Sequence, residues 1–320
     1  MKEKSFYVKS SPHIHSGASV QGIMFTVIAA LIPAGIAGVW YFRFNALILM
    51  LTCTVVCILT EAVIQKIRKV PITISDGSTI LTGLLLSFSL PASLPVWMAA
   101  VGSFFAIAIA KQAFGGLGCN IFNPALAGRV FLLTSWPKQM TSWVSPFSLD
   151  AISSATPLAI EKLNLQKPIP NIFDMLVGNR AGCIGETAII LLALGGIFLV
   201  YKNIITWHIP VTFIFTLGIL GWLFAGDEIF KMNPLFYLMA GGVILGAIFM
   251  ATDYVTSPLT ERGKIIFGFG CGFITFIIRE FGGFPEGVAY SILLMNCLVP
   301  LIDRLTQDRV FGTIKRKMAL

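Results

Sequence analysis

The residues with the clearest chemical potential lie in a run of small side chains from Asp150 to Leu158, with the sequence DAISSATPL. The hydroxyl groups of Ser153, Ser154 and Thr156 stand just before Pro157, which biases the preceding chain toward an extended or turn-like backbone. A hydroxyl in such a position is accessible to modification. The alternative interpretation is structural, with Thr156 as the N-cap of a helix that has Pro157 at its first position.

Four charged residues fall inside or at the edges of strongly apolar stretches: Glu61, Asp76, Arg129 and Asp253. A charge inside a membrane costs about 2.5–3.5 kcal/mol on insertion scales, so each of these groups needs a partner or water. One interpretation is that they are functional. The other is that Asp76 caps a short helix and that Arg129 pairs with a carboxylate or with backbone carbonyls.

The composition indicates what kind of protein must hold these groups. Of the 320 residues, 56% are hydrophobic and only 12% are charged, and the mean hydropathy is +0.84, whereas soluble proteins carry about 25% charged residues. Such a mixture cannot build a water-exposed surface, so we expect a membrane protein in contact with lipid. The net charge of +8 does not indicate nucleic acid binding, because Lys and Arg cluster beside apolar segments and not in a stripe with interleaved aromatics.

We expect an all-α polytopic membrane protein of about ten transmembrane helices, since ~20 apolar residues cross the hydrocarbon. Long apolar runs are found at about 20–42, 44–65, 94–111, 185–201, 204–224, 234–251, 264–279 and 287–302. Two shorter runs, at about 78–91 and 121–134, are bounded by Gly, Pro or Asn. Short or broken helices of this kind are typical of sites inside membrane proteins.

The distribution of charge predicts the orientation of the chain. With the N-terminus in the cytoplasm, most of the 23 Lys and Arg residues fall on the cytoplasmic side, as the positive-inside rule requires. Five spans on each side of a long loop give the two halves opposite orientations, and Phe-Gly-Gly at 114–116 and at 281–283 closes a span in each half, so we predict two inverted five-helix repeats. The expected segments are a cytoplasmic leader at 1–19, a first repeat at 20–134, an extracytoplasmic loop at 135–183, a second repeat at 184–303 and a basic cytoplasmic tail at 304–320.

The histidines and cysteines predict no metal centre. His13 and His15 form a pair just before the first span, which is short of the three or four protein ligands of a zinc site. The six cysteines are scattered, mostly within apolar runs, and show neither a disulfide framework nor a CxxC signature. We expect buried thiols.

Several motifs together resemble the membrane protein family shared by the D subunit of the Rnf complex and the B subunit of the sodium-translocating NADH:quinone reductase. Ser153-Ser154-Ala155-Thr156, with Asp150 ahead of it, resembles the flavinylation motif of that family. The likeness extends over nearly the whole chain, through Ser11-Pro12-His13, Ser75-Asp76-Gly77-Ser78, Phe114-Gly115-Gly116, Asn120-Ile121-Phe122-Asn123-Pro124, Gly128-Arg129 and Ala251-Thr252-Asp253-Tyr254. The short leader, and Ser154 where the reductase protein typically has Gly, favour the Rnf member of the family.

The resemblance implies a cofactor and its position. FMN is expected on the Thr156 hydroxyl through a phosphoester bond, installed by a separate flavin transferase, because an unperturbed threonine hydroxyl is a poor nucleophile. The resemblance also implies a second, non-covalent flavin (riboflavin), bordered by Asn120, Asn123, Arg129, Asp76 and Gly77. Asp253 and Glu61 are candidates for ion coupling.

The function that the resemblance implies is electron transport coupled to Na⁺ or H⁺ translocation across the cell inner membrane. The whole complex, with partner subunits A, B, C, E and G, moves electrons between ferredoxin and NAD, and flavin supplies the one-electron chemistry. This chain shows no phosphate-cradling glycine fingerprint between a strand and a helix, so we do not expect it to bind NAD itself. Three alternatives are the homologous B subunit of the sodium-translocating NADH:quinone reductase, an inverted-repeat solute transporter or channel, which would be colourless, and a structural scaffold with an unmodified Thr156.

Overall fold

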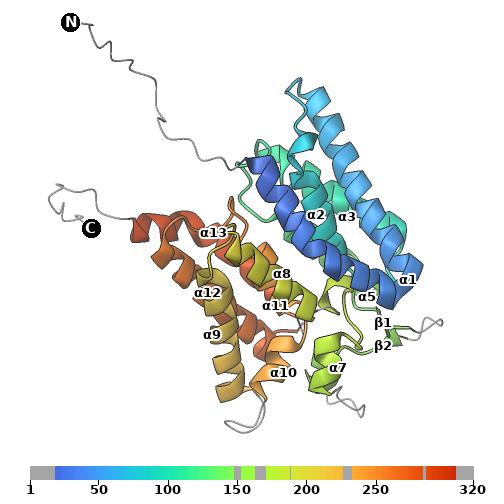
Figure 1. Ribbon diagram of the computed structural model, residues 1–320, viewed down its shortest axis with the longest axis vertical. Coiled ribbons are helices and arrows are strands. Elements are labelled where there is room, and N and C mark those ends of the chain that lie inside the picture. The colour runs from blue at the N-terminus through green and yellow to red at the C-terminus, as the bar shows by residue number, and fades with distance from the viewer. Residues whose placement is uncertain are drawn as a thin grey trace, which may run out of the picture.

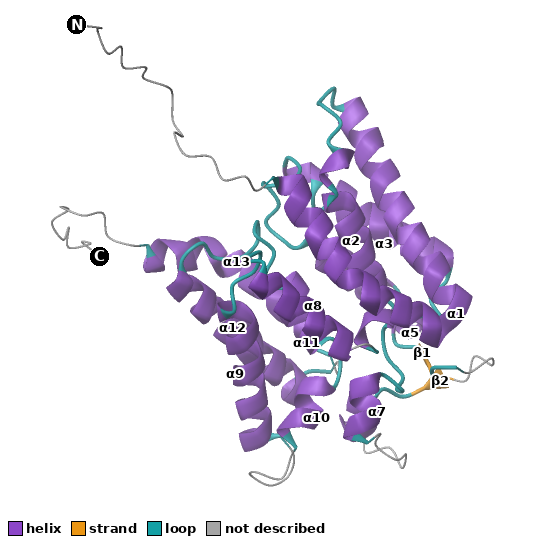
Figure 2. Ribbon diagram, in the orientation of Figure 1, coloured by secondary structure: helices purple, strands orange, loops and turns teal. Residues whose placement is uncertain are grey.

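The computed structural model describes residues 19–147, 153–162, 171–187, 189–225, 233–283 and 286–307. Within these ranges the chain is helical apart from its connecting loops and one pair of two-residue strands (Figure 2). Helices long and apolar enough to cross a membrane are found in the described ranges at Val20–Ile67, Val96–Phe114 and Val288–Thr306. The protein is thus mostly helical with several long apolar helices, as its composition predicts.

The first helix is much longer than one membrane crossing and is sharply bent. α1 (Val20–Ile67) has 48 residues, and Arg43 interrupts it with a non-helical φ of 54° and ψ of −138°. The two legs correspond to the runs predicted at 20–42 and 44–65, and they fold back on each other (Figure 1). Each leg is close to the ~20 residues that a crossing needs.

Two short helices complete the first half, as the runs bounded by Gly, Pro and Asn predict. α2 (Ser78–Phe88) follows the 3-10 turn η1 (Ile74–Asp76), and α4 (Pro124–Ser135) follows α3 (Val96–Ala108) and the 3-10 turn η2 (Gln112–Phe114). A side chain at Gly83 would bring its Cβ within 2.7 Å of the Thr54 Cα, so α2 packs backbone to backbone against α1. Asn123 caps α4 by accepting the Ala125 N–H at 3.1 Å.

The connection between the halves contains short elements only, within the residues that the structure describes. These are α5 (Pro137–Met140), β1 (Trp143–Val144), β2 (Ser153–Ser154), α6 (Pro157–Lys162) and α7 (Ile172–Val177). The strands pair antiparallel, with Trp143 opposite Ser154 and Val144 opposite Ser153. This two-stranded ladder is a small departure from the all-α expectation.

In the second half, one expected span is broken. The 3-10 turn η3 (Ile184–Glu186), α8 (Ile189–Tyr201) and α9 (His208–Phe224) precede α10 (Pro234–Met239), α11 (Val243–Leu245) and a π-helical turn, Gly246–Met250. The apolar run at 234–251 predicts one helix, but the helix is interrupted at residues 240–242. A buried arginine explains how the break is tolerated: Arg279 donates to the freed carbonyls of Tyr237 at 2.6 Å and Ala240 at 2.7 Å.

The last two helices pack beside this broken segment. α12 (Glu261–Phe281) lies against α9, and α13 (Val288–Thr306) contacts both α12 and α4 of the first half. The start of α1 and the end of α13 lie toward one side of the molecule, whereas β1, β2 and α7 lie toward the opposite side (Figure 1). Large apolar side chains remain exposed on the outer helices, among them Ile36, Phe44, Phe215 and Phe281, as a surface in contact with lipid requires.

Candidate functional site

Thr156 is the N-cap of α6, the structural role that the sequence allowed for it. Its Oγ1 accepts the Ala159 N–H at 3.2 Å, and its carbonyl accepts the Ile160 N–H at 2.9 Å. The Thr156 side chain is half-buried. Of its motif neighbours, Ser153 and Ser154 form β2 and Ala155 is half-buried, whereas Asp150 lies outside the described residues.

The α6 helix is docked onto the second half of the chain. The Lys162 ammonium donates to the Arg279 carbonyl at 2.5 Å and also to the Gly282 carbonyl. These carbonyls end α12, where unpaired C=O groups and the helix dipole both favour a cation. Leu158 packs in a small cluster with Met175, Phe236 and Ala240, so the segment next to Thr156 is held by apolar and polar contacts.

Glu161 also lies at this docking contact, outside the membrane-spanning segments. Partial burial, together with the nearby Glu280 carboxylate, raises the pKa of the Glu161 carboxyl to about 7, while Arg279 opposes both effects. Glu280 in turn accepts a hydrogen bond from the Tyr237 hydroxyl at 3.0 Å. The docking contact of α6 therefore contains a carboxyl group with a pKa near neutral pH.

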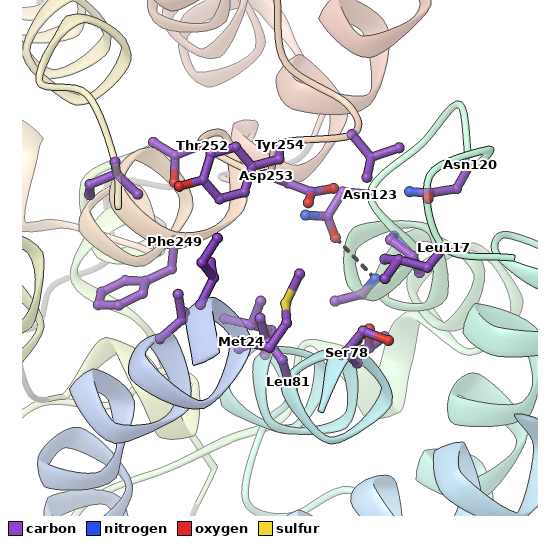
Figure 3. Close-up of a pocket in the computed structure, with 18 of the residues that line it drawn as sticks. Met24, Ser78, Leu81, Leu117, Asn120, Asn123, Phe249, Thr252, Asp253 and Tyr254 are labelled. Atoms are coloured by element: carbon purple, nitrogen blue, oxygen red, sulfur yellow. Dashed lines mark hydrogen bonds between the residues drawn. The ribbon is translucent and has the colours of Figure 1, made fainter. Parts of the chain in front are cut away.

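A cavity lies where the two halves meet, and we call it the inter-half cavity. Met24, Ser78 and Leu81 line it from α1 and α2, while Phe249 and residues 252–255 line it from the second half (Figure 3). Asn120 and Asn123 come from the loop before α4 and lie at the polar end of the cavity, near Asp253 (Figure 3). Sequence reasoning singled out Asn120, Asn123 and Asp253, and the fold brings them together.

The hydrogen bonds of these polar residues leave part of their capacity free. Asn123 donates to the Met250 carbonyl at 3.1 Å, which joins the two halves, and Asp253 accepts from the Thr256 hydroxyl at 3.0 Å. An amide has two donors and an acceptor, so Asn120 and Asn123 can still bind a heterocyclic edge. The free volume is about 70 Å³, below the ~300 Å³ at which small-molecule pockets begin, so a tricyclic ring needs rotation of side chains such as Met24 and Leu117.

Asp76 and Gly77 do not line this cavity. The Asp76 carboxylate accepts the Ser78 N–H at 2.8 Å and the Ser78 hydroxyl at 2.7 Å, which is the capping role that the sequence allowed. Gly77 has a left-handed φ of 79°, which glycine adopts most readily. The turn thus positions Ser78, which does line the cavity.

Glu61 is buried and fully paired, and its main partner was not identified from the sequence. The Lys111 ammonium donates to the Glu61 carboxylate at 2.8 Å, with side-chain exposures of 2% and 0%. Lys111 also donates to the Ser78 hydroxyl at 2.7 Å and lines the inter-half cavity. Thr79 and Gln112 donate to the same carboxylate. The detectable signal was a lysine at the end of an apolar run, which needs a buried anion.

Arg129 also lies away from the inter-half cavity. It forms an ion pair with Glu286, donates to the Ser89 carbonyl at 2.6 Å and contacts the Cys183 sulfur at 3.4 Å. Both of the structural partners that the sequence allowed, a carboxylate and a carbonyl, are present. Asn120 and Asn123 therefore line one cavity while Arg129 lines another, smaller one with Glu286 and Glu186.

The surroundings of Arg129 form a buried charge cluster that sequence reasoning missed. Ligand atoms of Cys183, Glu186 and Glu286 lie within 4.8 Å of one another, and Arg180 donates to the Glu186 carbonyl at 3.0 Å. Within the described ranges, the Glu186 Oε1 atom and the Arg180 Nε and Nη1 atoms are buried without a hydrogen-bond partner. The signal available in the sequence was Arg129 itself, since a buried arginine requires a carboxylate elsewhere in the chain.

All six cysteines are free thiols: Cys53, Cys57, Cys183 and Cys271 are buried, and Cys119 and Cys297 are exposed. The expectation of buried thiols is therefore confirmed for four of them. The pair His13 and His15 lies outside the described residues.

The fold and the site together define a helical membrane protein with a mostly apolar cavity between its halves, polar at one end, and a docked threonine-bearing loop. The chain belongs to the NQR2, RnfD, RnfE family, whose sequence pattern matches residues 7–312. It is 50% identical to the D subunit of the proton-translocating ferredoxin:NAD(+) oxidoreductase complex of Clostridium ljungdahlii, over 98% of each chain. It is 48% identical to the Na(+)-translocating counterpart of Acetobacterium woodii, over 99% of this chain and 98% of the relative. It is 38% identical to the D subunit of the ion-translocating oxidoreductase complex of Citrobacter koseri, over 96% and 99%.

Proposed function

We propose that this chain is the D subunit of an ion-translocating ferredoxin:NAD⁺ oxidoreductase complex of the Rnf type. The proposal is supported by near-complete coverage at about half identity to two such proteins and by family membership. Of the residues in the motifs that resemble the family, Thr156 lies in the docked loop, and Ser78, Asn120, Asn123 and Asp253 line the inter-half cavity. One of these relatives is named as proton-translocating and the other as Na(+)-translocating, so we propose translocation of either H⁺ or Na⁺.

Thr156 is the proposed attachment point for covalent FMN, and its surroundings fit that group. Thr156 is only partly buried, which leaves part of the residue accessible for modification by a flavin transferase. After esterification the Oγ1 atom keeps a lone pair and can still accept the Ala159 N–H that it accepts here. When bound, FMN supplies one-electron transfer. The chain's own contribution is to fix the attachment point, through the Lys162 contacts to the end of α12.

The inter-half cavity is our candidate site for a second, non-covalent flavin. Asn120, Asn123 and Ser78 offer hydrogen-bonding groups at one end of an otherwise apolar cavity, as small-molecule sites generally do. The candidates for ion coupling are Asp253, which lies at the same end of the cavity as these groups, and Glu61, which forms an ion pair with Lys111. Asp253 lines this cavity, and the ion-pair partner of Glu61, Lys111, lines it too, so a change in the charge of a bound redox group would alter the energy of both carboxylates.

We further propose the membrane orientation and the partners. The start of α1 and the end of α13 lie on the side opposite the Thr156 segment's strand β2 (Figure 1), which supports cytoplasmic termini, an extracytoplasmic flavin loop and inverted repeats in the cell inner membrane. Partner subunits A, B, C, E and G supply and accept the electrons, and a flavin transferase matures the chain.

The experiment is intact-mass measurement together with in-gel flavin fluorescence after denaturation, on protein expressed with a flavin transferase. Added FMN mass on the peptide spanning residues 150–160 is the expected result. Acid precipitation of the same sample tests the second site, because a non-covalent flavin is released into the supernatant. A colourless, unmodified chain would instead favour the solute transporter that broken helices around a central cavity also suit.

A further inference from the structure

A third cavity opens between the two legs of α1, and we call it the α1 groove. Its volume is about 760 Å³, within the ~300–1,000 Å³ that small-molecule pockets occupy. Its lining residues are Leu31, Ile32, Gly35, Ile36, Val39, Trp40, Arg43, Leu47, Met50, Leu84, Phe88 and Phe147. All except Arg43 are apolar or aromatic, so the groove suits a hydrocarbon ligand.

Arg43 is the charged member of this lining, and its position is unusual. It has the positive φ that bends α1, and its side chain is exposed. Within the part of the chain that the structure describes, no carboxylate forms an ion pair with it. An arginine at the end of an apolar groove favours a ligand with an anionic group, and a guanidinium binds phosphate in bidentate geometry.

The bend in α1 places the groove relative to the membrane surface. Each leg of α1 is about one crossing long, so the bend between them lies at the membrane–water interface whichever side that is. Trp40, which is 72% exposed, precedes the bend, and Trp and Arg both prefer this level. The apolar part of the groove then lies at the depth of the acyl chains.

We propose that the α1 groove is a specific binding site for an anionic phospholipid. One acyl chain lies between the legs of α1, over Leu84 and Phe88, and the phosphate lies on the Arg43 guanidinium. A transmembrane helix of a partner protein would also cover apolar side chains. The lipid is favoured because a single cation at the interface end of a hydrocarbon-lined groove matches the two parts of a phospholipid.

The bound lipid would also brace the loop that carries Thr156. Phe147 belongs to that loop and lines the groove, and its N–H donates to the Tyr41 carbonyl at 3.1 Å. The Tyr41 hydroxyl donates to the Val177 carbonyl at 2.7 Å. Phe147 and Val177, which both belong to this loop, are therefore hydrogen-bonded to Tyr41, close to the bend at Arg43.

The test is native mass spectrometry of the intact complex, titrated in detergent with phosphatidylglycerol or with phosphatidylcholine. We expect wild type to retain one phosphatidylglycerol in preference to phosphatidylcholine, and Arg43→Gln to bind it about fivefold more weakly, since one basic residue near a membrane surface contributes ~1 kcal/mol. Lys138→Gln is the matched control, because it removes an exposed cation that does not line the groove; its affinity should equal that of wild type. Ile36→Trp, which fills the groove, should weaken both lipids.

Equal retention of the two lipids by wild type would overturn the proposal, as would unchanged phosphatidylglycerol binding in Arg43→Gln. The wild-type comparison needs no variant, so it remains decisive if Arg43→Gln fails to assemble. A photo-crosslinking residue at position 36 tests directly which molecule occupies the groove. Crosslinks to lipid support the site, whereas crosslinks to another protein of the complex would overturn it by showing that a protein helix covers the groove.

Discussion

Arg129 on α4 and Glu286 just before α13 form an ion pair between residues 157 positions apart in the chain. Their side chains are 10% and 20% exposed. The other Glu286 oxygen accepts the Gly242 N–H at 2.7 Å, at the break between α10 and α11. One carboxylate thus connects the short helix of the first half to the broken segment of the second.

Replacement of Arg129 by Leu should lower the free energy of unfolding by about 3 kcal/mol, because it leaves Glu286 charged and nearly buried without its partner. The double variant Arg129→Leu with Glu286→Leu should recover part of that loss, since it removes both charges. Thermal unfolding in detergent, followed by size-exclusion chromatography, measures both. Arg262→Leu, at an exposed position of α12, is the control. A double variant less stable than the single one would contradict the pairing argument.

Replacement of Lys111 by Met should destabilise the first half by ~3–5 kcal/mol, because the Glu61 carboxylate is fully buried and would lose its counter-ion. It should also lower the yield of acid-releasable flavin, because Lys111 lines the inter-half cavity. Lys66→Met removes an exposed lysine at the end of the same helix as Glu61 and should change neither quantity. Wild-type stability in the Lys111 variant would contradict the argument that Lys111 stabilises the fold as the counter-ion of Glu61.

The docking of α6 onto the second half of the chain should weaken as the pH rises. The pKa of Glu161 is raised to about 7 in the folded protein from its ordinary value of 4.5, so its effect on docking is most favourable below pH 4.5. That advantage is lost as the pH rises through 7, where the carboxylate becomes charged beside Glu280. Hydrogen exchange of the 157–162 peptide, corrected for intrinsic rates, should show more protection at about pH 5 than at about pH 8. Glu161→Gln should remove the difference; a difference that persists would assign it to another group.

Two substitutions at Thr156 separate attachment from capping. Thr156→Ser keeps a hydroxyl that can serve both roles, so covalent flavin and α6 should persist. Thr156→Val keeps the shape but should abolish covalent flavin and cost ~1 kcal/mol of local stability, because the Ala159 N–H loses its acceptor. Intact mass and in-gel fluorescence read the first effect, and membrane insertion should be normal in both variants. Covalent flavin in the valine variant would refute the assignment.

The sequence by itself determined the features that depend on local interactions. Apolar runs of membrane length, the short helices bounded by Gly, Pro and Asn, and the Thr156 cap before Pro157 follow from neighbouring residues, because caps, proline and hydrophobic length act within a few turns. The family motifs likewise singled out Thr156, Asn120 and Asn123. Glu61 and Arg129 could be recognised as needing partners, because a buried charge is costly wherever it lies.

Only the tertiary structure decided which partner each charge found and which residues share a cavity. The sequence could not show that Arg129 pairs with Glu286, that Asn120 and Asp253 line one cavity from opposite halves, or that the helix expected at 234–251 breaks where Arg279 supplies donors. These contacts join segments far apart in the chain. Their geometry depends on how the helices pack, because no local preference of either residue specifies the other.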